Sequence, residues 1–123
     1  MNQALRAALA LAFCMTGGTA FAAGDPAAGK VVFAKCGICH SPDAGVNKIG
    51  PSLHGIVGRQ SASIPNFSYS PAMQNAHKVW DEKELNVYIT DPHADVPGTK
   101  MIFPGIKSDT DRQNLIAYLA TLK

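Results

Sequence analysis

Two cysteines stand three positions apart in the run KCGICH, and a histidine follows the second one directly. This spacing, C-x-x-C-H, is the attachment pattern of c-type haem. On a helical turn, side chains at positions i and i+3 lie on the same face, so Cys36 and Cys39 can each add to one vinyl group of a porphyrin. The imidazole of His40 is then directed at the iron from that same side. A chain with this motif is expected to fold around its cofactor.

The same residues could instead belong to a zinc site, a redox pair or a structural disulfide. A structural zinc site needs four protein ligands, commonly from two such pairs, but the chain has no second pair and its other histidines are scattered. A thioredoxin-like pair is expected in a βαβ context, whereas this pair follows a helical pattern. A disulfide between Cys36 and Cys39 would close a very short loop and contribute little. Haem is therefore the favoured interpretation.

The first 22 residues have the layout of a secretory signal peptide. A short start with one positive charge, Arg6, precedes an apolar run over residues 7–15, and the sequence AFA at 20–22 supplies a small-x-small cleavage site. The apolar run is shorter than the roughly 20 residues that a membrane-spanning helix needs. We therefore expect residues 1–22 to be cleaved after export and residues 23–123 to form a single domain in the periplasm.

Export would change both the cysteine content and the charge. Cys14 would leave with the leader, so Cys36 and Cys39 would be the only thiols in an oxidising compartment, where free thiols are uncommon. The full chain has 11 Lys plus Arg against 9 Asp plus Glu, and its net charge of +2 falls further with the loss of Arg6. This balance indicates neither a nucleic acid nor an anionic membrane as a partner.

Helix signals and long irregular segments alternate along the rest of the chain. Four segments begin with a capping residue and continue with helix-compatible residues, and no strand-like alternation stands out. We expect helices over residues 25–36, 70–76, 81–91 and 108–122. The loops at 41–69 and 91–108 are long for a compact domain. Because a few short helices do not fill a core, an apolar non-protein group is expected to fill it.

A second ligand to the iron must come from elsewhere in the chain. The candidates are Met73, Met101, His54, His77, His93 and Lys100. A lone methionine is most often a core residue, and Met73 falls within a short helical pattern. Met101 lies in PGTKMIFPG, where proline and glycine on both sides hold an extended loop that can press a thioether onto iron. The sequence therefore favours Met101.

Several segments occur in one characteristic order, namely CGICH, GPSLHGIVGR, FSYSPA, Trp80, PGTKMIF and LIAYL. In that order they resemble the class I c-type cytochromes, specifically the small soluble bacterial branch that is similar to mitochondrial cytochrome c. The resemblance runs from Gly24 to Lys123. It implies an all-α cytochrome c fold in which short helices and long loops wrap around one covalent haem c with its iron.

The resemblance implies a role for each matching position. Cys36 and Cys39 would carry the thioether bonds, and His40 and Met101 would be the axial ligands. The carbonyl of Pro51 would accept the other ring N–H of His40, a bond that fixes the orientation of the imidazole.

The resemblance also implies a surround for the cofactor and a contact between the terminal helices. It places Arg59, Tyr69 and Trp80 at the haem propionates, Tyr88 and Thr99 near the sulfur of Met101, Phe103 over the haem edge, and Gly29 and Phe33 against Tyr118. Buried propionates would be costly without such partners. Many relatives have Asn where this chain has Met73, so we expect a different hydrogen-bond network there.

These features predict a soluble periplasmic one-electron carrier of a respiratory or photosynthetic chain rather than an enzyme. The expected partners are a cytochrome bc1-type complex, a terminal oxidase, a reaction centre or a reductase, and we expect a monomer. Docking would use a weakly basic face that contains Lys35, Lys48, Lys100 and Lys107. Two alternatives stay open: a haem-based sensor or ligand-binding protein, and a peroxidase-like protein, each with a displaceable Met101.

Overall fold

The computed structural model describes residues 24–123, so the expected signal peptide lies outside the described part of the chain. Its elements are α1 (Pro26–Val32), the 3-10 turn η1 (Phe33–Lys35), α2 (Pro71–Gln74), α3 (Glu82–Thr90), α4 (Pro92–Asp95) and α5 (Asp109–Leu119). Within this range the only β pairing is an isolated bridge between Gln60 and Val79. The all-α prediction is therefore confirmed. None of the described helices is long and apolar enough to cross a membrane.

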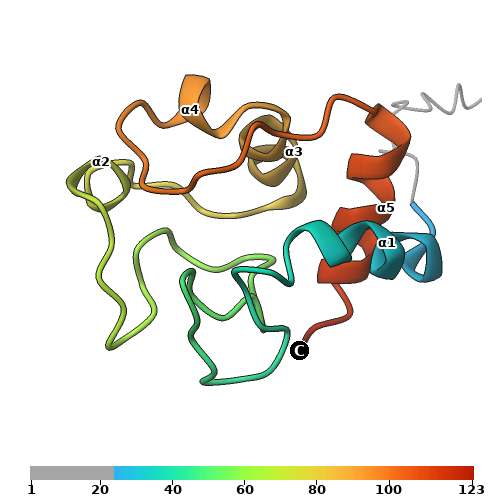
Figure 1. Cartoon of the computed structure of the whole chain (residues 1–123), viewed down its shortest axis with the longest axis horizontal. Coiled ribbons are helices and arrows are strands. Elements are labelled where there is room, and N and C mark those ends of the chain that lie inside the picture. Colours follow the sequence, from blue (N-terminus) through green and yellow to red (C-terminus); the bar gives the residue numbers. More distant parts are fainter. Residues whose placement is uncertain (1–23) are drawn as a thin grey trace, which may run out of the picture.

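The chain forms two sides joined at the terminal helices (Figure 1). The C-x-x-C-H turn and the long loop after it, residues 36–69, lie on one side, which we call the His40 side. The segment that contains α2, α3, α4 and the run up to α5, residues 70–106, lies on the other and is called the Met101 side. Helices α1 and α5 close one end between them. This division places the two predicted iron ligands on opposite sides.

Polar side chains begin the helices at the expected places. Ser108 Oγ accepts a hydrogen bond from Asp111 N at 3.2 Å at the start of α5. Asp81 Oδ1 accepts from Glu84 N at 2.8 Å at the start of α3. Each bond satisfies a backbone N–H that has no partner within the helix, which is why these short sequences form helices at these positions.

Two helix predictions need correction. The helix predicted over residues 70–76 is shorter in the structure, where α2 covers only the single turn Pro71–Gln74. His77 adopts a left-handed conformation with a φ of 48°, so a helix cannot continue through it. The predicted loop at 91–108 begins with another turn, α4, because Asp91 Oδ1 accepts from Ala94 N at 3.1 Å. Pro92 ends α3 and also begins α4, where its missing N–H costs nothing.

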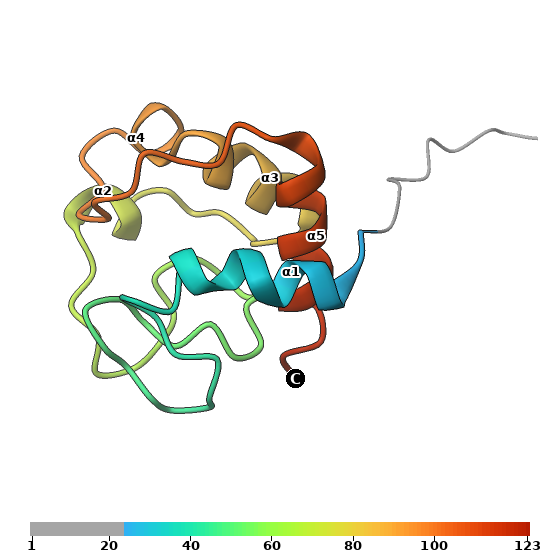
Figure 2. The same cartoon turned by 45° about the vertical axis from the view of Figure 1, so that its right-hand side comes forward.

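Helix α1 packs across α5, and this is the largest contact between helices (Figure 2). A side chain at Gly29 would overlap the backbone carbonyl of Asn114, so glycine is required for the close approach. The ring of Phe33 meets that of Tyr118 edge-on, with centroids 5.2 Å apart. The expected meeting of the first and last helices is therefore confirmed, and it holds the two sides together.

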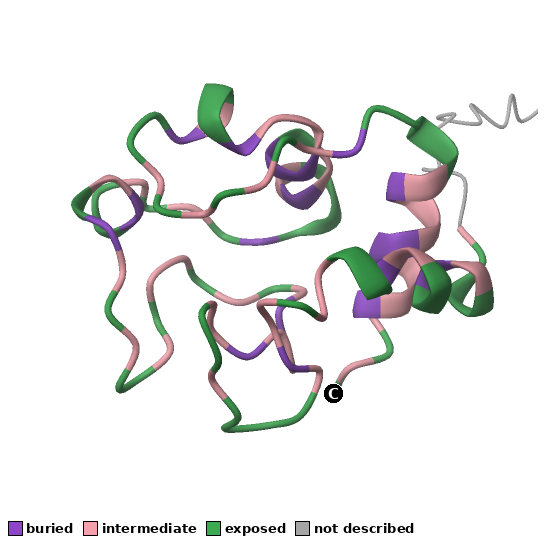
Figure 3. Cartoon of the chain, in the orientation of Figure 1, coloured by how far each residue is buried: buried purple, intermediate pink, exposed green. Residues whose placement is uncertain are grey.

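Helices α3 and α5 each carry several buried side chains, whereas the loops are mostly half-buried or exposed with single buried residues among them (Figure 3). Leu115 of α5 is fully buried, and Leu85 and Ile89 of α3 are nearly so. Other apolar side chains pack against this core while remaining partly exposed, among them Leu53, Val57, Tyr69, Met101 and Phe103. These loop residues present apolar surface that a bound group can cover.

Candidate functional site

The C-x-x-C-H run continues η1 as a hydrogen-bonded turn. Cys39 N and His40 N both donate to Cys36 O, at 3.0 and 2.9 Å. The turn places the two cysteine side chains on one face, and they form no disulfide with each other. Burial raises the pKa of Cys36 to about 11, although the charge of Lys35 opposes the shift. A thiol with a raised pKa is a poor redox nucleophile, which argues against the thioredoxin-like alternative.

The imidazole of His40 is held by the loop that follows it. Its Nδ1 lies 2.7 Å from the carbonyl oxygen of Pro51, and because a carbonyl can only accept, Nδ1 carries the proton. The other nitrogen, Nε2, is then the one with a free lone pair. Burial lowers the pKa of His40, and the bond to Pro51 opposes that shift. The ring is therefore arranged as a neutral ligand with its second-shell bond already made.

The loop after the motif is folded back onto it. Gly50 N donates to Cys39 O at 2.8 Å, and Leu53 N donates to Ser41 O at 2.9 Å. A side chain at Gly50 would overlap the ring of His40, so glycine lets the backbone pass directly against the imidazole. The glycine- and proline-rich composition of this loop thus serves to position His40.

A small polar cluster surrounds the sulfur of Met101. The hydroxyl of Tyr88 lies 3.6 Å from Met101 Sδ and 3.1 Å from Thr99 Oγ1. Thr99 Oγ1 also accepts a hydrogen bond from Met101 N at 3.3 Å. Burial raises the pKa of Tyr88, so its hydroxyl keeps the proton that it donates. Tyr88 and Thr99 lie where the resemblance placed them, beside the methionine.

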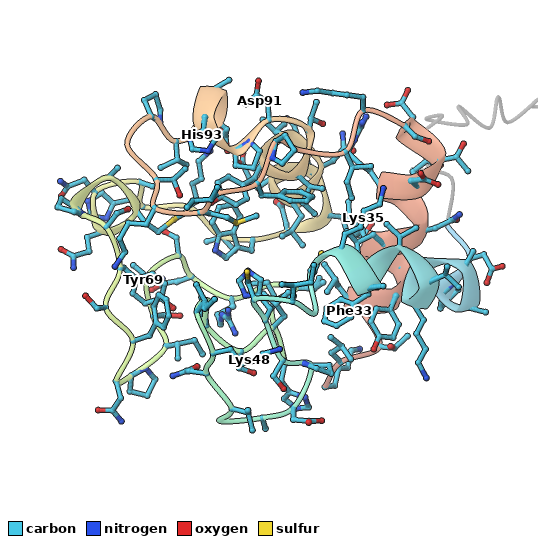
Figure 4. All side chains as sticks on the ribbon, viewed as in Figure 1. Phe33, Lys35, Lys48, Tyr69, Asp91 and His93 are labelled. Atoms are coloured by element: carbon cyan, nitrogen blue, oxygen red, sulfur yellow. The ribbon has the colours of Figure 1, made fainter. Side chains whose placement is uncertain are left out.

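The other candidate ligands are less well placed than Met101. Met73 is a core residue on α2, with 9% of its surface exposed. His54 Nδ1 is engaged by the carbonyl of Pro42 at 3.2 Å. His77 and His93 are exposed, and Figure 4 shows His93 beside Asp91 along the α4 edge of the molecule. Met101 is thus the candidate with both partial burial and a directed hydrogen bond to its ligating atom.

Arg59 forms the centre of the group predicted to hold the propionates. Its Nη1 donates to the carbonyls of Ser52 and His54 at 2.9 and 3.2 Å, and its own carbonyl accepts from Trp80 N at 2.8 Å. Burial lowers the pKa of Arg59, and the nearby Tyr69 opposes the shift. Within residues 24–123, Arg59 forms no ion pair with a carboxylate. A half-buried cation of this kind suits an anionic group such as a propionate.

The aromatic residues predicted for the site differ in how far they are buried. Trp80 is buried, and its ring lies 4.9 Å from that of Tyr88. Phe103 is half-buried against the core. Tyr69 is also half-buried, and its hydroxyl accepts a hydrogen bond from Ile64 N at 3.2 Å. The structure therefore brings Trp80 to the Met101 cluster through Tyr88 and to Arg59 through the backbone.

The four lysines of the predicted docking face differ in their surroundings. Lys35 is exposed, and Figure 4 shows it near α1, apart from Lys48 on the loop of the His40 side. The ammonium groups of the other three donate to carbonyls of this chain: Lys48 to Gly37, Lys100 to Ser68 and Lys107 to Thr90. These three lysines connect loops to neighbouring segments, a structural role that the sequence did not indicate.

One charged cluster was missed by the sequence analysis altogether. Lys78 Nζ lies 2.8 Å from Glu84 Oε2 and 3.2 Å from Asp95 Oδ1. The partners are 6 and 17 positions from Lys78, and Asp95 belongs to a helical turn that was predicted as loop. No spacing rule therefore pointed to this cluster before the fold was known.

Known proteins with similar sequences point to the same kind of site as this geometry. The sequence model of the cytochrome c family matches residues 26–123. The chain belongs to the cytochrome c family. It is 47% identical to cytochrome c-554 of Methylosinus trichosporium over 117 residues, which cover 94% of this chain and 89% of that protein. It is 44% identical to cytochrome c2 of Rhodomicrobium vannielii over 121 residues, which cover 97% and 96% of the two chains.

A solved structure supports the same family and fold. Cytochrome cH from Methylobacterium extorquens superposes with a TM-score of 0.75 at 39% identity, over 80% of this chain and 99% of that one. As a member of the cytochrome c family, this chain is an electron-transport protein that carries one haem c with its iron, covalently bound through Cys36 and Cys39. The zinc and disulfide interpretations of these cysteines are thereby excluded.

Proposed function

We propose that this cytochrome c is a soluble, periplasmic one-electron carrier in which His40 and Met101 ligate the haem iron. The haem supplies the one-electron chemistry, since its iron exchanges between the ferrous and ferric states. The observation that carries the proposal is that hydrogen bonds within the protein already orient both proposed ligands. His40 has Nδ1 engaged by Pro51, and the sulfur of Met101 accepts from the hydroxyl of Tyr88.

The histidine side supplies orientation and basicity. Donation from Nδ1 to the Pro51 carbonyl fixes the tautomer and turns Nε2 toward the ligand position. The lowered pKa of His40 keeps the imidazole neutral, as a metal ligand must be. Gly50 keeps the loop against the ring, which limits its rotation. These contacts favour one fixed geometry in both oxidation states.

The methionine side tunes the reduction potential. Ligation by His and Met gives a higher potential than ligation by two histidines. The bond from the Tyr88 hydroxyl withdraws electron density from the Met101 sulfur, which further favours the reduced iron. Arg59 would stabilise the propionates, and its charge acts in the same direction. These residues thus support a carrier whose reduction potential is shifted in the positive direction.

We further propose redox proteins as partners, namely a cytochrome bc1-type complex, a terminal oxidase, a reaction centre or a reductase, with the chain acting as a monomer. Transient redox contacts are small and are steered by charge. Lys35 is the predicted docking lysine whose exposed side chain is available for this purpose. Lys48, Lys100 and Lys107 add positive charge from positions fixed by their bonds to the backbone.

The replacement Met101→Ala tests the ligation in the ferric holo-protein. Wild type should show the far-red charge-transfer band of methionine bound to ferric iron, and M101A should lose it, bind added imidazole readily and have a lower potential. The control is Met73→Leu, which conserves volume at the buried methionine and should keep the band. A band that survives in M101A and disappears in M73L would assign the ligand to Met73. Absence of the band in wild type would favour the sensor or peroxidase-like alternatives.

Location is tested separately from ligation. When the full chain is expressed in a host that assembles c-type haem, the holo-protein should be released with the periplasmic fraction, and its amino terminus should begin near residue 23. Recovery of an uncleaved chain with the membrane fraction would contradict the periplasmic assignment without affecting the proposed ligands.

A further inference from the structure

Lys78 joins two acidic side chains that come from different helices of the Met101 side. Its ammonium group lies 2.8 Å from Glu84 on α3 and 3.2 Å from Asp95 at the end of α4. The exposed fractions of the side chains are 20% for Lys78, 35% for Glu84 and 12% for Asp95. The pair with Asp95 is therefore the more shielded from water, and the pair with Glu84 lies nearer the surface.

The backbone of Lys78 is fixed to the segment that contains Arg59. Lys78 N donates to Ser61 Oγ at 2.9 Å, and Ser61 N donates to Lys78 O at 2.8 Å. Two residues further on, Trp80 N donates to Arg59 O at 2.8 Å. The ammonium group of Lys78 thus extends from a backbone that is itself held in place on both sides.

Asp95 leads directly into the segment that carries Met101. The next residue, Val96, is 4% exposed, and its N–H donates to Pro92 O at 2.9 Å. Its carbonyl accepts from Thr99 N at 3.0 Å, and Thr99 Oγ1 accepts from Met101 N at 3.3 Å. A short series of hydrogen bonds therefore links the position of Asp95 to that of Met101.

The carboxylate of Asp95 depends on Lys78. Oδ1 pairs with the ammonium group, while Oδ2 is buried and has no hydrogen-bond partner among the described residues. Removing one member of a largely buried ion pair leaves an uncompensated charge, which is strongly unfavourable. Without Lys78, Asp95 would gain by moving toward water, and α4 would move with it.

We propose that Lys78 is a positioning residue for Met101: through Asp95 it fixes the loop that holds the methionine, and so it sets how readily an outside ligand displaces that methionine from the iron. This inference rests on the proposed ligation by Met101. Displacement requires residues 96–101 to move away from their bonded positions, and the Lys78–Asp95 pair opposes that movement. Glu84 contributes less because it lies on α3, which need not move.

The test measures the affinity of the ferric holo-protein for imidazole. Binding is monitored by the loss of the far-red band. Lys78→Met and Asp95→Asn should each bind imidazole about tenfold more tightly than wild type. Lys78→Arg keeps the positive charge, so its affinity for imidazole should stay within about twofold of that of wild type. Glu84→Gln leaves the Lys78–Asp95 pair intact and should also stay within that range. The matched control is Lys83→Met, at an exposed lysine on the same helix as Glu84.

The free energy of unfolding, measured by denaturant on each variant, separates positioning from general stability. If imidazole affinity follows the loss of unfolding free energy in all variants, E84Q included, Lys78 acts through global stability and the inference is wrong. If wild type shows the far-red band but K78M and D95N bind imidazole with the same affinity as wild type, the inference is wrong. The proposed function would still stand. A wild type without the band would instead overturn the ligation by Met101. If K78M does not accumulate, D95N and K78R decide the question.

Discussion

The two proposed iron ligands, His40 and Met101, are positioned in different ways by the two sides of the molecule. His40 is positioned by residues close to it in the chain, because Pro51 is 11 positions away and the loop between them folds back on the motif. Met101 depends on Tyr88 from α3 and on a loop that is tied to Lys78 through Asp95. The histidine is therefore set by local structure, whereas the methionine is set by contacts among separate elements. If both residues ligate the iron as proposed, we expect Met101 to be the ligand that is more easily displaced.

Glycine substitutions give the largest expected contrast between the two sides. Gly50→Ala would place a side chain against the His40 ring, which is held by its bond to Pro51, so we expect a loss of about 2–3 kcal/mol in the free energy of unfolding. On the Met101 side, Gly98 has a φ of +91°, and an added Cβ would lie 3.2 Å from Ala72 Cβ. Gly98→Ala should therefore cost about 1–2 kcal/mol in the free energy of unfolding. Denaturant unfolding of the holo-proteins measures both.

The spectra of these variants should differ as well. G98A should weaken the far-red band at ambient temperature while keeping the haem attached, and G50A should lower the yield of holo-protein because His40 is displaced during assembly. The control is Gly45→Ala, which has a φ of +73° with open space around the added methyl group and so reports backbone strain alone. If G50A costs no more than G45A, the loop does not hold the imidazole.

The sequence predicted the His40 side more completely than the Met101 side, for the same physical reason. The C-x-x-C-H turn is a local feature whose geometry follows from spacing, and so are the caps at Asp25 and Ser108 of the two terminal helices that adjoin it. The fold class and the haem were predictable because the motif and the loop composition act together. Position 51 was predicted from the resemblance, and the structure shows its carbonyl bonded to His40.

The features that the sequence did not predict have two causes. The turn α4 is local, because Asp91 caps it and Pro92 begins it, as Asp25 and Pro26 do for α1, although residues 91–108 were expected to form a loop. The others depend on tertiary contacts. The cluster around Lys78 brings together charges from three segments, and the ammonium groups of Lys48 and Lys100 are bonded to backbone carbonyls of other loops. Spacing along the chain carries no information about such pairs.

High pH should affect the Met101 side before the His40 side. The pKa of Lys78 is raised above its ordinary value of 10.5, chiefly by the hydrogen bond to Glu84 and then by Asp95, and burial raises the pKa of Tyr88. Because the folded protein holds both protons more tightly than the unfolded chain, their contribution is complete below the ordinary values. It is lost as the pH rises through the raised pKa values.

A pH titration of the far-red band in the ferric protein checks this order. We expect the band to disappear at alkaline pH while the haem remains bound and the helical signal in circular dichroism persists. Lys78→Arg should move the midpoint to higher pH because arginine stays charged. Simultaneous loss of the band and of the helical signal would show that the two sides unfold as one unit at high pH.

The smallest expected effect separates lysines that dock from lysines that also hold a loop. Lys35→Glu changes an exposed charge at the end of η1, so we expect slower electron transfer to an acidic partner at low salt and stability within about 0.5 kcal/mol of wild type. Lys100→Glu removes the bond to Ser68 O and the contact over the ring of Phe67, where Nζ lies 5.9 Å from the centroid. It should slow transfer similarly and also cost about 1 kcal/mol. Stopped-flow rates against ionic strength and denaturant unfolding measure the two effects. If the two variants lose the same stability, Lys100 is an ordinary surface charge, and the Met101 side is held by fewer contacts than its hydrogen bonds indicate.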